Sequence, residues 1–231
     1  MTDIADIIEI FSSVQGEGLF IGQRHIFVRV KGCNLNCAFC DTDKEASYET
    51  LDISRTIKQI EDLNLYSIHN TVALTGGEPL LYSGFLKGLL PQIRDRGFKV
   101  YLETNGTLTD KLDDVIPYVD TISVDIKLPS VSKIKPYWDE HKRFLERAFE
   151  KEFFVKVIVS DEIDMAEFDK ALTLVREMSF DIPFIIQPET KKDSCCINIS
   201  ANTLLILQER ALKALNNVLV IPQAHKMMGM R

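Results

Sequence analysis

The chain has 231 residues, a formal net charge of -7 at pH 7, and a composition that is 45% hydrophobic and 26% charged. This length suffices for one large hydrophobic core, and we expect a single domain over residues 1–231. No apolar run is long enough to cross a bilayer, so a membrane protein is excluded. Nucleic-acid-binding proteins usually carry clustered Lys and Arg. The acidic charge therefore favours a small-molecule partner and argues against nucleic acid.

The first eleven residues, MTDIADIIEIF, carry acids where a secretory signal would carry lysines, and no small-residue cleavage pattern follows. We therefore expect a cytoplasmic protein. The chain has five cysteines, three of them in one short stretch. In a reducing compartment, such crowding favours metal binding over disulfide formation.

Seven short runs of β-branched and aromatic residues predict strands. They are residues 25–30, 71–75, 99–104, 121–126, 154–160, 184–187 and 218–222. Apolar residues at helical spacing lie between them, at residues 53–60, 85–93, 172–178 and 204–215. Gly97 should end the second of these helices, and Pro91 should kink it or mark a new start.

The alternation of strands and helices implies parallel strands joined by right-handed crossovers. This α/β pattern fits an open doubly wound sheet or a whole or partial barrel, and six or seven strands favour an incomplete barrel. Polar motifs follow the strands, among them GGEP after residues 71–75 and PQAH after residues 218–221. Loops at the carboxyl ends of parallel strands converge, so we expect one shared pocket there.

Cys33, Cys37 and Cys40 form a CxxxCxxC motif. Soft thiolates select zinc, copper(I) or an iron–sulfur cluster. A structural zinc ion needs a fourth protein ligand. The candidates for that ligand are His25, His69, Cys195 and Cys196. A [4Fe–4S] cluster held by three cysteines instead keeps one iron open for the amine and carboxylate of a small molecule.

The sequence carries a resemblance at these residues. CxxxCxxC after a strand, Phe39 between the last two cysteines, and GGEP after the next strand resemble the radical S-adenosylmethionine (SAM) superfamily. The resemblance implies that a [4Fe–4S] cluster on the three cysteines binds SAM and cleaves it to a 5′-deoxyadenosyl radical. Glycine at positions 76 and 77 would allow close approach of the backbone to a ligand.

Further motifs narrow the resemblance to the 7-carboxy-7-deazaguanine synthase family. They are SSVQGEG, FVRVKGCNLNC, CDT, TGGEP, ETNGT, SVDIK, QP and PQAHK, which run nearly from end to end. The resemblance implies a radical SAM lyase with a partial (β/α)6 TIM-like barrel, usually a homodimer. It also implies ring contraction of 6-carboxy-5,6,7,8-tetrahydropterin with loss of ammonia, in queuosine and archaeosine biosynthesis. Mg2+ and an external flavodoxin- or ferredoxin-like electron donor would take part.

The same resemblance implies roles for individual residues. The expected substrate-binding residues are Val14, Gln15, Gly16, Glu17, Arg29, Thr75 and His225. The expected SAM-binding residues are Phe39, Gly77, Glu78, Ser123, Asp125, Lys127 and Gln187. Thr42 is the expected Mg2+ ligand, beside Cys33, Cys37 and Cys40 as the cluster ligands. The terminal carboxylate of Arg231 would reach the site if the tail folds back, and Cys195 and Cys196 have no expected role beyond a loop and strand edge.

Plainer interpretations of these residues exist. Gln15 and Glu17 would suit a polar loop, and Arg29 would suit an ion pair with a nearby acid. Residues 41–43 would suit a solvated turn, and a lone histidine near a C-terminus is usually exposed. Two rival functions also remain: another radical SAM enzyme, such as a glycyl-radical activase that docks a protein, and a non-catalytic zinc-binding module.

Overall fold

The computed structural model describes residues 3–43, 45–191 and 196–230. Within these residues, nine strands form one sheet in the order β3-β1-β2-β4-β5-β6-β7-β8-β9. They are β1 (Ile4–Val14), β2 (Arg24–Val30), β3 (Glu49–Asp52), β4 (Thr71–Gly76), β5 (Lys99–Thr104), β6 (Thr121–Ile126), β7 (Glu152–Val159), β8 (Phe184–Pro188) and β9 (Val218–Val220). From β2 to β9 every neighbouring pair is parallel. The seven predicted strands are confirmed.

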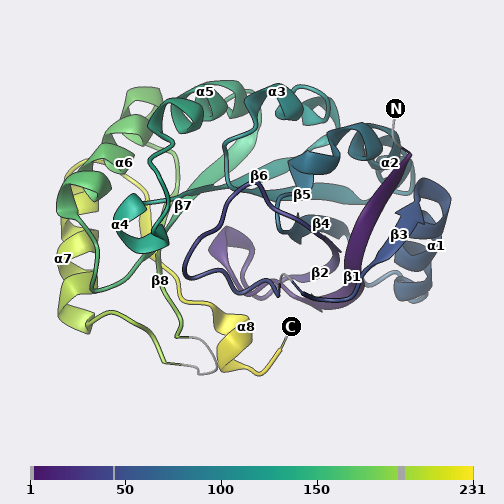
Figure 1. Cartoon of the computed structure of the whole chain (residues 1–231), viewed down its shortest axis with the longest axis horizontal. Helices are drawn as coiled ribbons and strands as arrows, with labels where there is room; N and C mark the ends of the chain where they lie inside the picture. The colour runs from purple at the N-terminus through teal and green to yellow at the C-terminus, as the bar shows by residue number, and fades with distance from the viewer. Residues whose placement is uncertain (1–2, 44, 192–195, 231) are drawn as a thin grey trace.

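The sheet is curved and the longer helices lie on its outer side (Figure 1). They are α1 (Ile53–Leu63), α2 (Ser83–Asp95), α5 (Trp138–Ala148), α6 (Met165–Met178) and α7 (Ala201–Leu212). Short helices occupy the connections: η1 (Gly18–Phe20), η2 (Pro79–Tyr82), α3 (Thr109–Leu112), η3 (Ile116–Tyr118), α4 (Pro129–Ser132) and α8 (Ala224–Met227). Because β3 and β9 are edges, the barrel is open, which confirms the predicted partial barrel.

Two strands were absent from the sequence prediction. β1 pairs antiparallel with both β2 and β3, and so extends the parallel part of the sheet by an antiparallel edge. Helix α5 was also not predicted, and α7 ends three residues before the predicted limit of 215. Pro91 lies inside α2, which continues on both sides of it, so it does not mark a new start.

Helix starts follow local side-chain chemistry. The side chains of Asp52, Asp164 and Ser200 accept hydrogen bonds from backbone N–H groups in the first turns of α1, α6 and α7. These caps satisfy donors that a helix leaves unpaired at its N-terminus. The apolar faces then pack against the sheet, as Ile57 and Ile60 of α1 do. No helix within the described residues is both long and apolar enough to span a membrane.

The inner face of the sheet changes character along each strand. The part that lies before the carboxyl ends of the parallel strands is apolar. Its residues pack into one cluster, which contains Phe11, Phe27, Ala73, Tyr101, Phe154 and Ile185. Successive side chains on a strand alternate faces, so the residue two positions later again points inward. Those residues are Arg29, Thr75, Glu103, Lys156 and Gln187, and all of them line the cavity described below. The apolar cluster therefore fills the barrel interior beneath the cavity, and polar groups line the cavity at the carboxyl ends of the strands.

Candidate active site

One cavity of about 210 Å³ lies at the carboxyl ends of the parallel strands. The segment that follows β2 crosses the middle of the barrel there and carries the cysteines (Figure 1). Seventeen of the eighteen predicted site residues line this cavity, with Glu78 as the exception. The sequence-based prediction of one shared pocket is thus reproduced by the geometry, while the role of each residue stays a prediction.

The cysteine loop is held by backbone contacts to the loop after β4. Glu78 N–H donates to Gly32 O at 2.8 Å, and Gly77 N–H donates to Val30 O at 3.1 Å. A Cβ on Gly77 would lie 1.8 Å from Gly32 O, which no side chain allows. The glycine at position 77 is therefore needed for the close approach of two protein loops, in addition to any approach of a ligand.

The three cysteines suit a cluster better than a single zinc ion. Three thiolates around one zinc ion would lie about 3.8 Å apart, given Zn–S bonds of about 2.3 Å. Among the described residues, the one group of three or more His, Cys, Asp or Glu side chains with ligand atoms within 4.8 Å contains no cysteine. An iron–sulfur cluster holds each cysteine on a different iron and spreads the sulfurs further. The donor set therefore fits a [4Fe–4S] cluster.

The candidate zinc ligands do not join the cysteines. His25 is buried near the start of β2, among Phe20, Phe27 and Tyr101. His69 precedes β4, where its ring contacts Ser12 and Asn64. Both histidines lie toward the end of the barrel away from the cysteine loop, because that loop follows the carboxyl end of β2.

The remaining cysteines stay without a role. Cys196 is exposed beside the isolated bridge that pairs Thr190 with Ile197. Cys195 and Arg231 lie outside the described residues.

The surrounding protein partly excludes water from these thiols, even though Cys33 reaches the surface, and this desolvation raises the pKa of Cys37 to about 11 and also raises that of Cys33. Both thiols are therefore protonated at neutral pH in the metal-free chain. Iron binding must displace these protons, because the thiolate is the ligand.

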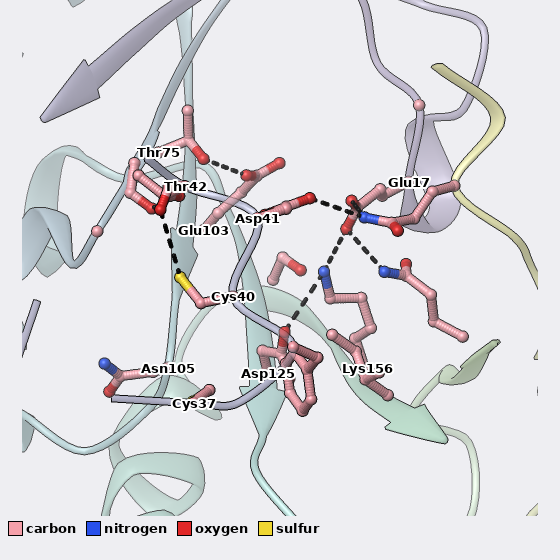
Figure 2. A pocket seen from close by; sticks show the side chains of 18 of the residues that line it. Glu17, Cys37, Cys40, Asp41, Thr42, Thr75, Glu103, Asn105, Asp125 and Lys156 are labelled. Atoms are coloured by element: carbon pink, nitrogen blue, oxygen red, sulfur yellow. Dashed lines mark hydrogen bonds and ion pairs between the residues drawn. The ribbon is translucent and has the colours of Figure 1, made fainter. Parts of the chain in front are cut away.

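One wall of the cavity is a hydrogen-bonded set around Glu103 (Figure 2). Its carboxylate accepts from Gln15 Nε2 at 2.8 Å and from Thr75 Oγ1 at 2.6 Å. Gln15 is only 2% exposed and also accepts from the Glu17 N–H at 3.0 Å. The segment of Gln15 and Glu17 is thus fixed in the cavity wall and is not a solvated polar loop. The sequence analysis did not single out Glu103, although it lies in the ETNGT motif.

Glu17 accepts hydrogen bonds from three directions. Lys156 forms an ion pair with it, and Gln187 Nε2 and Gln223 Nε2 donate at 3.1 and 2.8 Å. Although burial alone would raise it, the pKa of Glu17 lies far below its ordinary value because of Lys156 and these donors. The carboxylate is therefore charged at neutral pH.

Arg29 combines its two predicted environments. Its Nε donates to Glu9 Oε1 at 2.9 Å, and the guanidinium lies 5.4 Å from the centre of the Phe11 ring. It also lines the cavity. The ion pair thus positions a guanidinium at the cavity, and the terminal N–H groups of a guanidinium suit a ligand oxygen.

The loop after Cys40 lies opposite Glu17. Thr42 Oγ1 donates to Gly76 O at 3.2 Å, and Asp41 pairs with Lys226 at 2.9 Å. Gln223 Nε2 donates to both Glu17 and Asp41, at 2.8 and 3.2 Å. Glu17, Asp41 and His225 offer ligand atoms within 4.8 Å of one another, although lysines already pair with both carboxylates.

The opposite wall carries the residues predicted to contact SAM. Lys127 pairs with Asp125 Oδ2 at 2.8 Å and lies 5.1 Å from the centre of the Phe39 ring. Asp125 Oδ1 and Gln187 Oε1 are buried in this wall and have no hydrogen-bond partner among the described residues. Buried acceptors are nearly always paired. Two orphaned acceptors in a cavity wall fit a ligand that supplies hydroxyl, ammonium or N–H donors, as SAM does.

Glu78 lies behind this wall. It is fully buried and accepts from Leu80 N, Thr104 Oγ1 and Asn105 N at 3.1, 2.8 and 2.8 Å. Burial nevertheless raises its pKa to about 7. Its side chain ties the loop after β4 to the end of β5. A contact with the methionyl ammonium stays a prediction, and the side chain does not line the cavity.

Comparison with known proteins agrees with this geometry. The Radical SAM superfamily matches residues 27–173. Over 97% of both chains, this chain is 38% identical to the 7-carboxy-7-deazaguanine synthase of Geobacter sulfurreducens. It is 34% identical to that of Methanopyrus kandleri, over 96% of this chain and 92% of the relative. The crystal structure of QueE from Escherichia coli has the same fold, with a TM-score of 0.70, 22% identity, and coverage of 96% and 95% of the two chains.

The fold, the cysteine loop and the superfamily match define a radical SAM enzyme, with a [4Fe–4S] cluster and SAM as its cofactors. Similarity over the full chain then places it more narrowly. The chain belongs to the 7-carboxy-7-deazaguanine synthase family.

Proposed function

We propose that this chain converts 6-carboxy-5,6,7,8-tetrahydropterin to 7-carboxy-7-deazaguanine with loss of ammonia, for 7-deazapurine biosynthesis. The carrying observation is that three thiols and a wall of hydrogen-bonding groups share one cavity. The named relatives support the substrate. A pterin offers a planar edge of N–H and carbonyl groups and a carboxylate, and the wall offers groups of matching polarity.

In this proposal Cys33, Cys37 and Cys40 hold the cluster, and the walls around Phe39, Gly77 and Asp125 hold SAM. When bound, the cluster and SAM supply a 5′-deoxyadenosyl radical that abstracts hydrogen from the pterin. The protein's share is to leave one cluster position without a cysteine and to orient the two ligands in one cavity. The apolar floor below, which includes Phe27, Tyr101 and Phe154, limits access of water from that side.

The substrate contacts follow from donor and acceptor types. The Glu17 carboxylate accepts from pterin N–H groups, and the Gln15 amide both donates and accepts. Arg29 binds the substrate carboxylate through its terminal N–H groups. Thr75 and His225 complete the wall, together with Val14 and Gly16.

Mg2+ would bind at Thr42. A hard ion suits a hydroxyl together with substrate oxygens, and it would neutralise the substrate carboxylate. The position of the Thr42 hydroxyl, at the cavity and against Gly76 O, supports this assignment.

The proposal also covers the wider state of the protein. It is a single domain of residues 1–231, acts as a homodimer in the cytoplasm, and receives electrons from a flavodoxin- or ferredoxin-like donor. The exposure of Cys33 and Cys40 supports electron entry from the surface, since a cluster there would lie near solvent.

Anaerobic incubation of the reconstituted, reduced protein with the pterin, SAM and Mg2+ tests the function. We expect the deazaguanine product, with SAM regenerated. Formation of 5′-deoxyadenosine without any product would reject the substrate and favour an activase. A colourless protein with stoichiometric zinc and no iron would reject the radical chemistry and favour a zinc-binding module.

A further inference from the structure

Lys156 lies between the two walls of the cavity and was not predicted from the sequence. Its ammonium pairs with Glu17 on the substrate wall and, at 3.4 Å, with Asp125 Oδ2 on the SAM wall (Figure 2). Lys127 pairs with the same Asp125 oxygen at 2.8 Å. Negative and positive groups thus alternate across the cavity from Glu17 to Lys127. The Lys156 side chain is only 12% exposed, so solvent screens these pairs weakly.

The two carboxylates that pair with Lys156 are held in place in different ways. Asp125 and Lys156 are partners in the parallel register of β6 and β7, so the sheet fixes their relative position. Glu17 precedes the short helix η1 in the connection between β1 and β2, outside the sheet. Side-chain contacts must therefore locate its carboxylate, and the ion pair with Lys156 connects it to a central strand.

The buried carboxylates around Lys156 also need a nearby positive charge. The titratable groups that face Glu17 are Lys156 from β7, Glu103 and Tyr101 from β5, Asp41 from the cysteine loop, and His225 from the C-terminal segment. Burial and Glu17 together raise the pKa of Glu103, whereas Lys156 lowers it. The pKa of Lys156 itself lies well above its ordinary value, since three carboxylates outweigh its burial. Without this ammonium, buried carboxylates would repel one another.

Resting on the proposed function, we propose that Lys156 is a positioning residue for the substrate: it ties the Glu17 carboxylate to Asp125 and thereby aims the Glu17 oxygens at the pterin. Lys156 does not itself touch the pterin in this arrangement. Its loss should therefore act on substrate affinity through Glu17 and spare the capacity to cleave SAM.

The test compares Lys156→Met and Lys156→Arg with the wild type. Calorimetric titration of the anaerobic protein with the pterin should show affinity about 10- to 100-fold weaker for Lys156→Met, with KM raised more than kcat is lowered. Lys156→Arg keeps the charge and should recover part of the affinity. Lys213→Met is the matched control, because Lys213 is an exposed lysine that pairs with Glu209 on the outer helix α7.

A double-mutant cycle identifies the partner. In a Glu17→Gln background, Lys156→Met should weaken pterin affinity by less than about threefold further, because the carboxylate that it positions is gone. Equal losses in both backgrounds would overturn the proposal. So would a Lys156→Met protein with wild-type pterin affinity.

The experiment distinguishes failure of the positioning role from misfolding of the variant and from failure of the proposed function. If Lys156→Met does not fold, as thermal unfolding would reveal, Lys156→Gln replaces it with the same expectation. A wild-type protein that makes no deazaguanine rejects the proposed function itself. A productive wild type with an unaffected Lys156 variant rejects only the positioning role.

Discussion

At the scale of single residues, Arg29 shows how an ion pair can prepare a binding group. Glu9 accepts a hydrogen bond from Arg29 Nε, and the Phe11 ring lies against the guanidinium. Because the Arg29 side chain is already held in place, it loses little conformational entropy when it binds a ligand. The Arg29 side chain lines the cavity, so its guanidinium is placed to bind an anionic group there.

We predict that Arg29→Ala weakens pterin affinity about 10- to 100-fold, because a charge-assisted pair of hydrogen bonds is lost. Cleavage of SAM to 5′-deoxyadenosine without product should remain measurable. Arg29→Lys keeps the charge without the fork and should lie between the two proteins. Unchanged pterin affinity in Arg29→Ala would contradict a role in carboxylate binding.

Glu78 leads to a prediction on pH. Its pKa rises from an ordinary 4.5 to about 7 in the folded chain, chiefly because of burial. Between these values the folded state binds a proton that the unfolded state has lost, so stability falls as pH rises from about 4.5 to about 7. A shift of this size corresponds to about 3 kcal/mol.

Urea unfolding of the metal-free chain at pH 5 and pH 8, for the wild type and Glu78→Gln, tests this effect. Glutamine does not titrate, so the comparison removes the contribution of other groups. We expect the stability of the wild type relative to the variant to fall by about 2 to 3 kcal/mol between the two pH values. A constant difference would show that Glu78 does not titrate in this range.

At the scale of elements, the three cysteines lie outside the hydrophobic core, although Phe39 between two of them packs against it. Cys33 and Cys40 are exposed and Cys37 is half-buried, while the core consists of strands and outer helices. We predict that Cys37→Ser prevents cluster assembly, as iron analysis and absorbance of the reconstituted protein would show. The free energy of unfolding of the metal-free chain should change by only about 1 kcal/mol.

The outcome of that experiment separates two kinds of metal site. A structural metal contributes directly to folding, so its loss would lower stability together with iron content. Any ligand that binds only the folded state stabilises it to some extent. If Cys37→Ser lost iron and also lost more stability than this effect explains, relative to the reconstituted wild type, the metal would have a structural role.

The sequence predicts an element well when its pattern of apolar residues matches the way the folded element is buried. The central strands are short runs rich in β-branched and aromatic residues, which is the composition typical of strands. β6, TISVDI, is buried along its whole length although Thr, Ser and Asp alternate there with Ile and Val. β1 alternates irregularly because a register shift interrupts its pairing with β2. In α5 a charged majority hides the stripe of His141, Phe144, Leu145 and Ala148, although its spacing is helical.

At the scale of the whole molecule, the motifs after the strands predict the place of the cavity, because parallel strands share one carboxyl end. They do not predict which side chains pair across it. Lys156 and Glu17 are 139 positions apart in the sequence. They meet only because the fold places the loop between β1 and β2 against β7. The partners of Glu78 were hidden for the same reason, since the GGEP motif does not reveal that its carboxylate points toward β5.

The C-terminal segment meets the loop after β1 at this cavity and closes one side of it. Ala224 N–H donates to Gly16 O at 2.9 Å, and a Cβ on Gly16 would lie 2.2 Å from His225 Nδ1. Gln223 joins Glu17 and Asp41 in the same region. The C-terminal segment thus forms one wall of the pocket and adds little to the main hydrophobic cluster.

We predict that removal of residues 223–231 weakens pterin affinity by more than about 100-fold, because Glu17 loses a donor and the cavity loses His225. Iron content after reconstitution and the thermal midpoint should stay close to wild type, since α8 has no buried residue. Gly16→Ala is the point-substitution counterpart and should act in the same direction by displacing His225. If the truncated chain bound the pterin as well as the full chain does, the segment would have no part in closing the site.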